Sequence, residues 1–332
     1  MREIYNVSSS PHVFSQDSAQ TIMMDVVIAL IPAGIFGIYN FGIKALLVIL
    51  TCIVSCILTE YIYEKLMKLP LTTGDLSAVV TGMLLGLNMP VSAPLWMSVL
   101  GSVFAIFIVK MLFGEIGQNF MNPALGGRVF LVISFSNIMS DFSIESLNII
   151  KPKLTDFIMN GALSVDGITG ATPLTALKAG ENVDVLDMFF GNISGTIGET
   201  SAIALLIGGA YLLIKKVINW RIPVTYIVSF LIFVGIFGGQ GFDLYFLLAH
   251  FLGGGLLIGA IFMATDYTTS PITAQGEIIY GIMLGIMTGV FRIYGKTAAG
   301  VSFAIIFCNL FVPLIDKYVH PRYFGKGVKS NE

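Results

Sequence analysis

The sequence predicts an all-α polytopic membrane protein with about ten transmembrane helices, some of them short or broken. Apolar residues make up 55% of the 332 residues and charged residues only 11%, less than half of the roughly 25% that is usual in soluble domains. The mean hydropathy is +0.86. Long apolar runs recur from end to end, so we expect one membrane domain over residues 1–332.

Ten apolar runs are candidates for membrane spans, because a spanning helix needs about 20 mainly apolar residues. The predicted spans cover residues 22–39, 42–63, 76–89, 95–113, 124–136, 196–214, 223–238, 242–264, 277–292 and 297–316. The third, fifth and ninth runs are short and contain glycines. Broken helices of this kind commonly line a cofactor or ion cavity, since lipid cannot satisfy exposed backbone groups.

The positions of lysine and arginine predict the orientation. With the N-terminus inside, twelve of the 18 basic residues fall in cytoplasmic segments and six fall outside. Cytoplasmic loops of membrane proteins carry this excess of positive charge. We therefore expect a multi-pass protein of the plasma (inner) membrane with cytoplasmic tails at 1–20 and 317–332. The long loop at 137–195 then lies on the extracytoplasmic side.

Short matches about 200 residues apart suggest an internal duplication. The matching pairs are 34–37 with 235–238, 82–86 with 281–285, and 104–106 with 303–305. They align the first span with the seventh, as in a parallel repeat. An inverted repeat of five plus five spans would align the first with the sixth. The sequence leaves both arrangements open.

Composition and motifs exclude several functions. The net charge of −2 gives no basic footprint, so we expect no nucleic-acid partner. The three cysteines stand in apolar runs and the three histidines are far apart, so no metal site is predicted. The chain carries no phosphate-binding loop and no dinucleotide fingerprint. Any NAD or ferredoxin chemistry is therefore expected to belong to other subunits.

The long polar loop contains Asp-Gly-Ile-Thr-Gly-Ala-Thr at residues 166–172. Gly170 and Ala171 have little or no side chain, so a bulky cofactor can approach, and Gly170 permits a tight backbone. The hydroxyl of Thr172 can form a phosphoester. Asp166 can hold a magnesium ion or orient the loop. By itself the segment also fits an ordinary Gly/Thr/Pro turn between spans.

A second polar segment, residues 113–131, includes Asn119 and Asn122 just before a short predicted helix. Pro123 suits the first helical position and Asn122 the cap before it. Arg128 is expected to be an anchor facing the cytoplasm. Glu115 is expected to be a solvated carboxylate at the membrane interface.

Three further carboxylates lie near predicted helix starts. Asp266 stands beside a span, where an ionisable group is a functional candidate, and it fits a cation ligand and a helix cap equally well. Asp75 and Glu277 open short helices, where the helix dipole favours a carboxylate.

Two long motifs and the loop between the spans together carry a family resemblance. Thr-Gly-Ala-Thr-Pro-Leu-Thr-Ala-Leu-Lys at 169–178, the run at 113–131 with its Asn-Pro-Ala and Gly-Arg elements, and Thr-Asp and Ser-Pro within 264–271 resemble one family. It contains the D-type components of Rnf complexes and the B-type components of sodium-pumping quinone reductases. The resemblance implies that a flavin transferase esterifies FMN to Thr172. Asp166, Thr169, Gly170 and Ala171 match the rest of the acceptor motif.

The resemblance also implies a function. The chain is expected to be an electron-transfer subunit of an Rnf-type complex, which couples electron transfer between ferredoxin and NAD to sodium or proton translocation. RnfA, RnfB, RnfC, RnfE and RnfG are the expected partner subunits, with membrane lipid around them. The quinone reductase relative implies that Asn119 and Asn122 contact a non-covalent riboflavin. The alternatives are a B-type component of a quinone reductase, and a solute transporter or channel, for which the flavin loop has no use.

Overall fold

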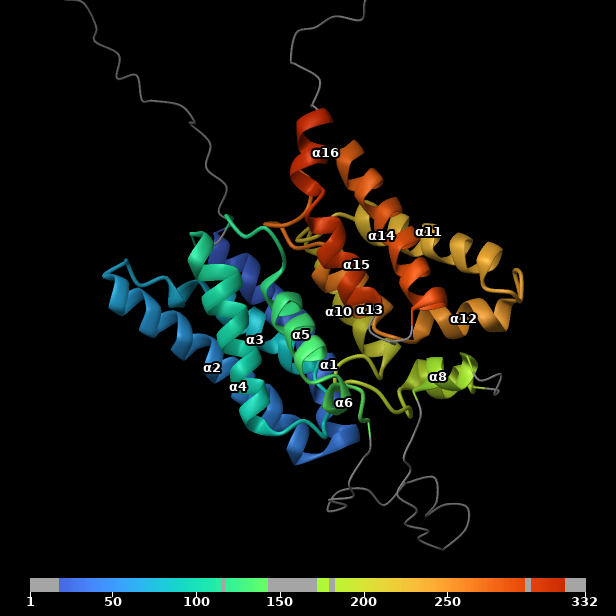
Figure 1. Ribbon diagram of the computed structural model, residues 1–332, viewed down its shortest axis with the longest axis horizontal. Coiled ribbons are helices and arrows are strands. Elements are labelled where there is room, and N and C mark those ends of the chain that lie inside the picture. The colour runs from blue at the N-terminus through green and yellow to red at the C-terminus, as the bar shows by residue number, and fades with distance from the viewer. Residues whose placement is uncertain (1–17, 115–116, 143–171, 179–182, 296–299, 320–332) are drawn as a thin grey trace, which may run out of the picture.

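The computed structural model describes residues 18–114, 117–142, 172–178, 183–295 and 300–319. Every regular element within these ranges is a helix (Figure 1). The predicted class, an all-α membrane protein, is confirmed. Of the predicted cytoplasmic tails, only residues 18–20 and 317–319 lie within the described chain.

The first group of helices, blue to green in Figure 1, precedes the long loop. Its elements are α1 (Ala19–Phe41), α2 (Ile43–Met67), the 3-10 turn η1 (Thr73–Asp75), α3 (Ser77–Leu87), α4 (Leu95–Val103), the π-helix η2 (Phe104–Lys110), the 3-10 turn η3 (Met111–Phe113), α5 (Pro123–Ser134) and α6 (Ser136–Met139). Helix α2 packs along α3 and α4, and α5 packs against η2.

The second group, yellow to red in Figure 1, follows the short loop helices α8 (Pro173–Lys178) and α9 (Val185–Phe190). Its elements are α10 (Ala202–Ile214), α11 (Arg221–Phe237), α12 (Leu244–Leu252), α13 (Leu256–Ile258), the π-helix η4 (Gly259–Met263), α14 (Ala274–Tyr294), α15 (Gly300–Asn309) and α16 (Val312–Tyr318). Helix α14 packs along α11 and α15. Contacts of α1 with α10 and of α5 with α15 join the two groups.

All ten predicted spans coincide with helices, but the helices differ in length. Four are long and apolar enough to cross a bilayer: α1, α2, the continuous run Leu95–Phe113, and α14. Two more are bent pairs, α12 with α13 and η4 at 61°, and α15 with α16 at 42°. The remaining four, α3, α5, α10 and α11, are shorter apolar helices. Length therefore gives four to six full spans, and the ten-span topology stays a prediction.

The helix breaks lie elsewhere than predicted: the third and fifth spans, α3 and α5, are short as expected but continuous through their glycines. The ninth span was expected to be short, but α14 runs unbroken over 21 residues. No break was predicted in the eighth span, where Gly253 to Gly255 separate α12 from α13. Gly254 and Gly255 have φ of 67° and 68°, in the left-handed region that favours glycine. The left-handed backbone of Gly254 and Gly255 therefore breaks the eighth span, whereas the glycines within α14 leave that helix continuous.

Several helices, but not α2, α4 or α11, begin at a local side-chain cap. Side-chain oxygens of Ser18, Asn122, Ser201, Asp243 and Thr273 accept hydrogen bonds from first-turn backbone N–H groups of α1, α5, α10, α12 and α14. These residue types are the usual N-caps, because the first N–H groups of a helix have no partner within it.

Glycines that match about 200 residues apart do not occupy equivalent positions. Gly82 and Gly86 of α3 face α2, the second predicted span, near Ile53 and Ile49. Gly285 of α14 faces α11, the seventh, where an added Cβ would lie 2.6 Å from the Phe230 nitrogen. A parallel repeat pairs the second and third spans with the eighth and ninth. In such a repeat the glycines of the ninth span, α14, would face the eighth span, as those of α3 face α2. These glycines are therefore explained by close helix packing, and the repeat itself stays a prediction.

Candidate functional site

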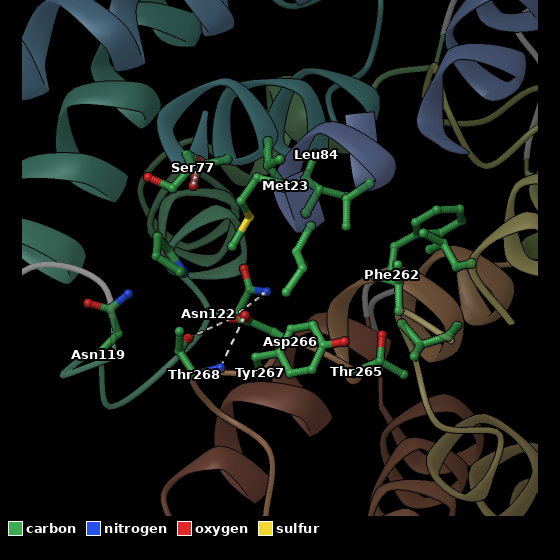
Figure 2. Close-up of a pocket in the computed structure, with 18 of the residues that line it drawn as sticks. Met23, Ser77, Leu84, Asn119, Asn122, Phe262, Thr265, Asp266, Tyr267 and Thr268 are labelled. Atoms are coloured by element: carbon green, nitrogen blue, oxygen red, sulfur yellow. Dashed lines mark hydrogen bonds between the residues drawn. The ribbon is translucent and has the colours of Figure 1, made fainter. Parts of the chain in front are cut away.

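A cavity of about 70 Å³ lies between the two helical groups (Figure 2). Its walls come from α1, α3, the start of α5, the turn between α10 and α11, and the segment from η4 to Thr268. The polar groups that line it include Ser77, Lys110, Asn119, Asn122 and Asp266. Eleven of the twenty lining residues are apolar and nine are polar or charged, so apolar walls surround several convergent polar groups, as in many ligand sites.

Asn122 caps α5, as predicted. Its Oδ1 accepts from the backbone nitrogens of Ala124 at 3.0 Å and Leu125 at 3.3 Å, and Pro123 occupies the first helical position. Its Nδ2 faces the second helical group, 3.4 Å from the Met263 carbonyl and 3.5 Å from Asp266 Oδ2. The amide of Asn122 therefore links the two groups as well as starting a helix.

Asn119 lies at the edge of the same cavity, away from Asn122 in Figure 2. Its side chain is buried, and its Oδ1 has no hydrogen-bond partner in the described part of the chain. The structure therefore brings both predicted asparagines to one cavity. Only Asn119 retains an unused acceptor.

Asp266 is no helix cap, because Thr273 caps α14. Its carboxylate holds the turn that follows, accepting from Thr268 Oγ1 at 3.0 Å, Thr268 N at 3.4 Å and Thr269 Oγ1 at 3.4 Å. Burial raises the pKa of the Asp266 carboxyl above its usual range. The carboxyl lies beside Asn122 at the centre of the cavity (Figure 2), and its role as a cation ligand stays a prediction.

The predicted roles of Asp75 and Glu277 at helix starts are confirmed. Asp75 Oδ1 accepts from Ser77 N at 2.8 Å and Ser77 Oγ at 2.6 Å at the beginning of α3. Glu277 lies in the first turn of α14 and also pairs with α11, 2.9 Å from Arg221 Nη1. Asn219 donates to its other oxygen at 2.7 Å.

Arg128 is not the interfacial anchor that the sequence suggested. It is buried, donates to Asn88 Oδ1, and lies 4.0 Å from Glu199 Oε2. Gly127 lets α5 approach α4 so closely that a Cβ there would lie 2.7 Å from the Gly101 carbonyl. This close approach brings the neighbouring arginine into the core, where it meets the end of α3.

Arg292 is a second buried arginine, only 1% exposed. It donates to the carbonyls of His250, Gly253 and Gly254, at the break between α12 and α13. Its guanidinium also lies 4.9 Å from the centre of the Phe230 ring. Carbonyls freed by a broken helix need partners inside a membrane, and Arg292 supplies them.

Of the predicted flavin loop, Asp166, Thr169, Gly170 and Ala171 lie outside the described residues. Thr172 immediately precedes α8, and its carbonyl accepts from the nitrogens of Thr175 and Ala176. Its side chain is 8% exposed, and its Oγ1 lies 3.1 Å from Thr175 Oγ1.

Helix α8 is docked on the break between α12 and α13. A Cβ on Gly253 would lie 3.3 Å from Leu174 Cγ, so this side chain fills the space that the glycine leaves. Lys178 donates to the Gly295 carbonyl at 2.9 Å. Partial burial and the nearby Arg292 lower the pKa of Lys178. The buried guanidinium of Arg292 and the exposed ammonium of Lys178 therefore both lie near α8.

Three buried charges were missed in the sequence: Glu60 and Glu64 on α2, and Lys110 on η2. Glu60 Oε2 lies 2.7 Å from Lys110 Nζ. The available signal was the pair of carboxylates four residues apart inside an apolar 25-residue helix, which places both on one face.

Comparison with known proteins adds a family assignment. The family model described as NQR2, RnfD, RnfE matches residues 6–325. The chain is 44% identical over 324 residues to the D component of the Na(+)-translocating ferredoxin:NAD(+) oxidoreductase complex of Acetobacterium woodii, covering 96% of this chain and 95% of that protein. It is 41% identical over 336 residues to the D component of the Proton-translocating ferredoxin:NAD(+) oxidoreductase complex of Clostridium ljungdahlii, covering 98% and 97%.

A third relative is the D component of the Ion-translocating oxidoreductase complex of Cronobacter sakazakii, 35% identical over 348 residues, with coverage of 97% of this chain and 99% of that protein. The family match covers the helices, the residues that line the cavity and the predicted loop at 137–195, which contains Thr172. The chain therefore belongs to the NQR2, RnfD, RnfE family.

Proposed function

We propose that the chain is the D-type membrane component of an Rnf complex and carries electrons on an FMN esterified to Thr172. The observation that carries the proposal is the end-to-end match to the D components of ferredoxin:NAD(+) oxidoreductase complexes. In this role the chain works with other Rnf subunits and with membrane lipid, and a flavin transferase matures it. The complex couples electron transfer between ferredoxin and NAD to translocation of sodium or protons.

The surroundings of Thr172 support a phosphoester at this position. A phosphodiester carries one negative charge, which is stabilised by nearby cations. Lys178 ends the same short helix, and Arg292 donates to Gly254, against which α8 is docked. The flavin supplies the redox chemistry when bound. The chain's own contribution is to hold the helix that Thr172 precedes against the α12–α13 break through Leu174, with Lys178 at the other end of that helix and Arg292 at the break.

Helix α8 offers two neighbouring hydroxyls, so the attachment residue needs a direct test. Thr175 is more exposed than Thr172, and the two oxygens are 3.1 Å apart. Thr172→Ala and Thr175→Ala should be compared in protein co-expressed with its flavin transferase. We expect flavin fluorescence on a denaturing gel, and a mass increase of FMN less one water, in the wild type and Thr175→Ala. Thr172→Ala should lose both signals.

Fluorescence that survives Thr172→Ala and disappears in Thr175→Ala would move the attachment to the second hydroxyl. A wild-type protein without covalent flavin would overturn the redox role. Assembly with the other subunits gives an independent check, because co-purification of the complex tests membership whether or not flavin is attached. Quinone reduction by the purified complex would favour the quinone reductase alternative, whereas electron transfer between ferredoxin and NAD would favour an Rnf-type complex.

A further inference from the structure

A cluster of buried charges lies at the end of α2, outside the flavin loop. Glu60 and Glu64 occupy its last two turns and are 0% exposed. Lys110, at the end of η2, is 2% exposed. Its ammonium lies 2.7 Å from Glu60 Oε2 and donates to Ser77 Oγ at 2.6 Å. The ammonium is therefore committed to Glu60 and to the start of α3.

Glu64 has no such cation. Its Oε1 accepts from Thr72 N at 3.0 Å and from Thr72 Oγ1. Its Oε2 is buried and has no hydrogen-bond partner among the described residues. A buried carboxylate oxygen without a partner is costly, because nothing replaces the water that it gave up.

The charges in the cluster do not balance. Two buried carboxylates face one ammonium, which leaves one negative charge. The nearby titratable groups on the other packed elements of the described chain are Lys110 on η2 and Asp75 on η1, and Asp75 adds negative charge. α3 offers only the hydroxyl of Ser77 and α4 no charge. An uncompensated buried charge disfavours folding, so one bound positive charge would balance the two fully buried carboxylates, whereas Asp75 is only partly buried.

The cluster lies between two hollows. Thr72 and Asp75 line an open groove at the surface, together with Ser18. Ser77 and Lys110 line the central cavity, which also contains Asp266. Thr72 lies between the two carboxylates: its backbone N–H donates to Glu64, and its Oγ1 is within hydrogen-bond distance of Glu64 Oε1 and 3.4 Å from Glu60 Oε1. Glu60 then pairs with Lys110, which donates to Ser77. Polar groups thus run from the surface groove, past the end of α2, to the central cavity.

We propose that Glu64 binds one monovalent cation, a proton or a sodium ion, which enters from the groove at Thr72. The cluster of Glu60, Glu64 and Lys110 is then the entrance of an ion path toward the central cavity. In the predicted topology this entrance faces the cytoplasm. The use of the ion in coupling rests on the proposed function, whereas its binding to Glu64 does not.

The test measures binding through the stability of the intact purified complex, since a ligand of the folded state raises Tm with its concentration. Tm is recorded in sodium chloride and in choline chloride, and over a range of pH at fixed sodium. In the wild type we expect Tm to rise with sodium if sodium is bound, or as pH falls if a proton is bound. Glu64→Gln keeps the shape, removes the charge and should lose that dependence.

Glu277→Gln is the matched control. Glu277 is a buried carboxylate of α14 whose two oxygens both have partners, Asn219 and Arg221. This variant should keep the sodium or pH dependence of the wild type, even if its Tm is lower throughout. A wild-type Tm without either dependence overturns the proposal, as does a Glu64→Gln variant that responds like the wild type.

A second measurement separates this site from the flavin. In proteoliposomes that contain the whole complex, Glu64→Gln should lose ion uptake while the covalent flavin stays in place. Ion-dependent stability in a protein without covalent flavin would refute only the redox role. Full ion uptake by Glu64→Gln would refute only the ion entrance.

Discussion

Asn122 illustrates how one side chain can serve a local and a long-range purpose. Its oxygen caps α5, while its amide nitrogen faces Met263 and Asp266 on the other side of the cavity. Loss of an Asn cap costs about 1 kcal/mol. A substitution at Asn122 therefore lowers the stability of the protein whether or not a ligand binds, so its effect does not identify a ligand contact. Asn119 has no cap role and retains a free oxygen within the described chain, so it is the better probe of the cavity.

We predict that Asn119→Leu lowers the amount of non-covalent flavin if riboflavin binds in the cavity. One lost hydrogen bond is worth roughly 0.5–1.5 kcal/mol, so affinity should fall by up to about tenfold. Acid-extractable flavin should decrease while covalent flavin on Thr172 is unchanged. Flavin content and Tm of the intact complex are the measurements.

Asn122→Leu is the comparison for this prediction, and it should lower Tm as well as flavin content. The free space of about 70 Å³ holds only a few waters, so the lining side chains must move apart before a flavin ring enters. Equal extractable flavin in wild type and Asn119→Leu, or none in either, would assign both asparagines a structural role only.

At the scale of elements, small residues decide how closely two helices approach. An added Cβ at Gly285 would lie 2.6 Å from Phe230 N and 2.7 Å from the Tyr226 carbonyl, both backbone atoms of α11. An added Cβ at Gly34 of α1 would meet only Met83 Cε, at 3.6 Å, an ordinary contact. The same substitution is thus expected to have opposite effects in the two helices.

We predict that Gly285→Ala destabilises the protein by about 1–3 kcal/mol, because α14 must move away from α11. Gly34→Ala should be neutral or stabilising by about 0.4–1 kcal/mol, since alanine restricts the unfolded chain. Thermal unfolding of the two purified variants in detergent is the measurement. Equal Tm values would mean that α11 and α14 are not in close contact.

At the scale of the whole molecule, α16 lies near the top of the view in Figure 1, and α8 lies lower, beside α12. The predicted topology, in which Thr172 is extracytoplasmic and the C-terminal segment cytoplasmic, stays a prediction. Helices α11 and α14 run in the same direction, because Gly285 and Gly289 of α14 meet Phe230 and Phe233 of α11 in the same order. In the predicted ten-span chain α11 is the seventh span and α14 the ninth, and two odd-numbered spans cross the membrane in the same direction.

Cysteine labelling in intact cells can test this topology. The native cysteines Cys52, Cys56 and Cys308 are buried, so the wild type serves as the unlabelled control. Asp187 on α9 and Lys317 on α16 are exposed. Asp187→Cys should react with an impermeant thiol reagent from outside, and Lys317→Cys only after permeabilisation. The reverse pattern would put Thr172 on the cytoplasmic side, away from the expected transferase.

Local patterns in the sequence determined the class and much of the layout. Apolar runs of sufficient length predict membrane helices whatever surrounds them, and all ten coincide with helices. The Asn122–Pro123 cap and the carboxylates at the starts of α3 and α14 also depend on neighbouring residues alone. The motif around Thr172 indicated the family in the same way, through an uninterrupted stretch of chain.

Tertiary structure decided which distant residues meet, and no local pattern contains that information. Arg128 was expected at the cytoplasmic surface, but close helix packing buries it, and Arg292 is buried at a broken helix. Glu60 and Lys110 are 50 residues apart and meet only because α2 packs against η2. A charge is stable inside a membrane protein only beside its partners. The contacts between helices therefore determined where this protein keeps its buried charges.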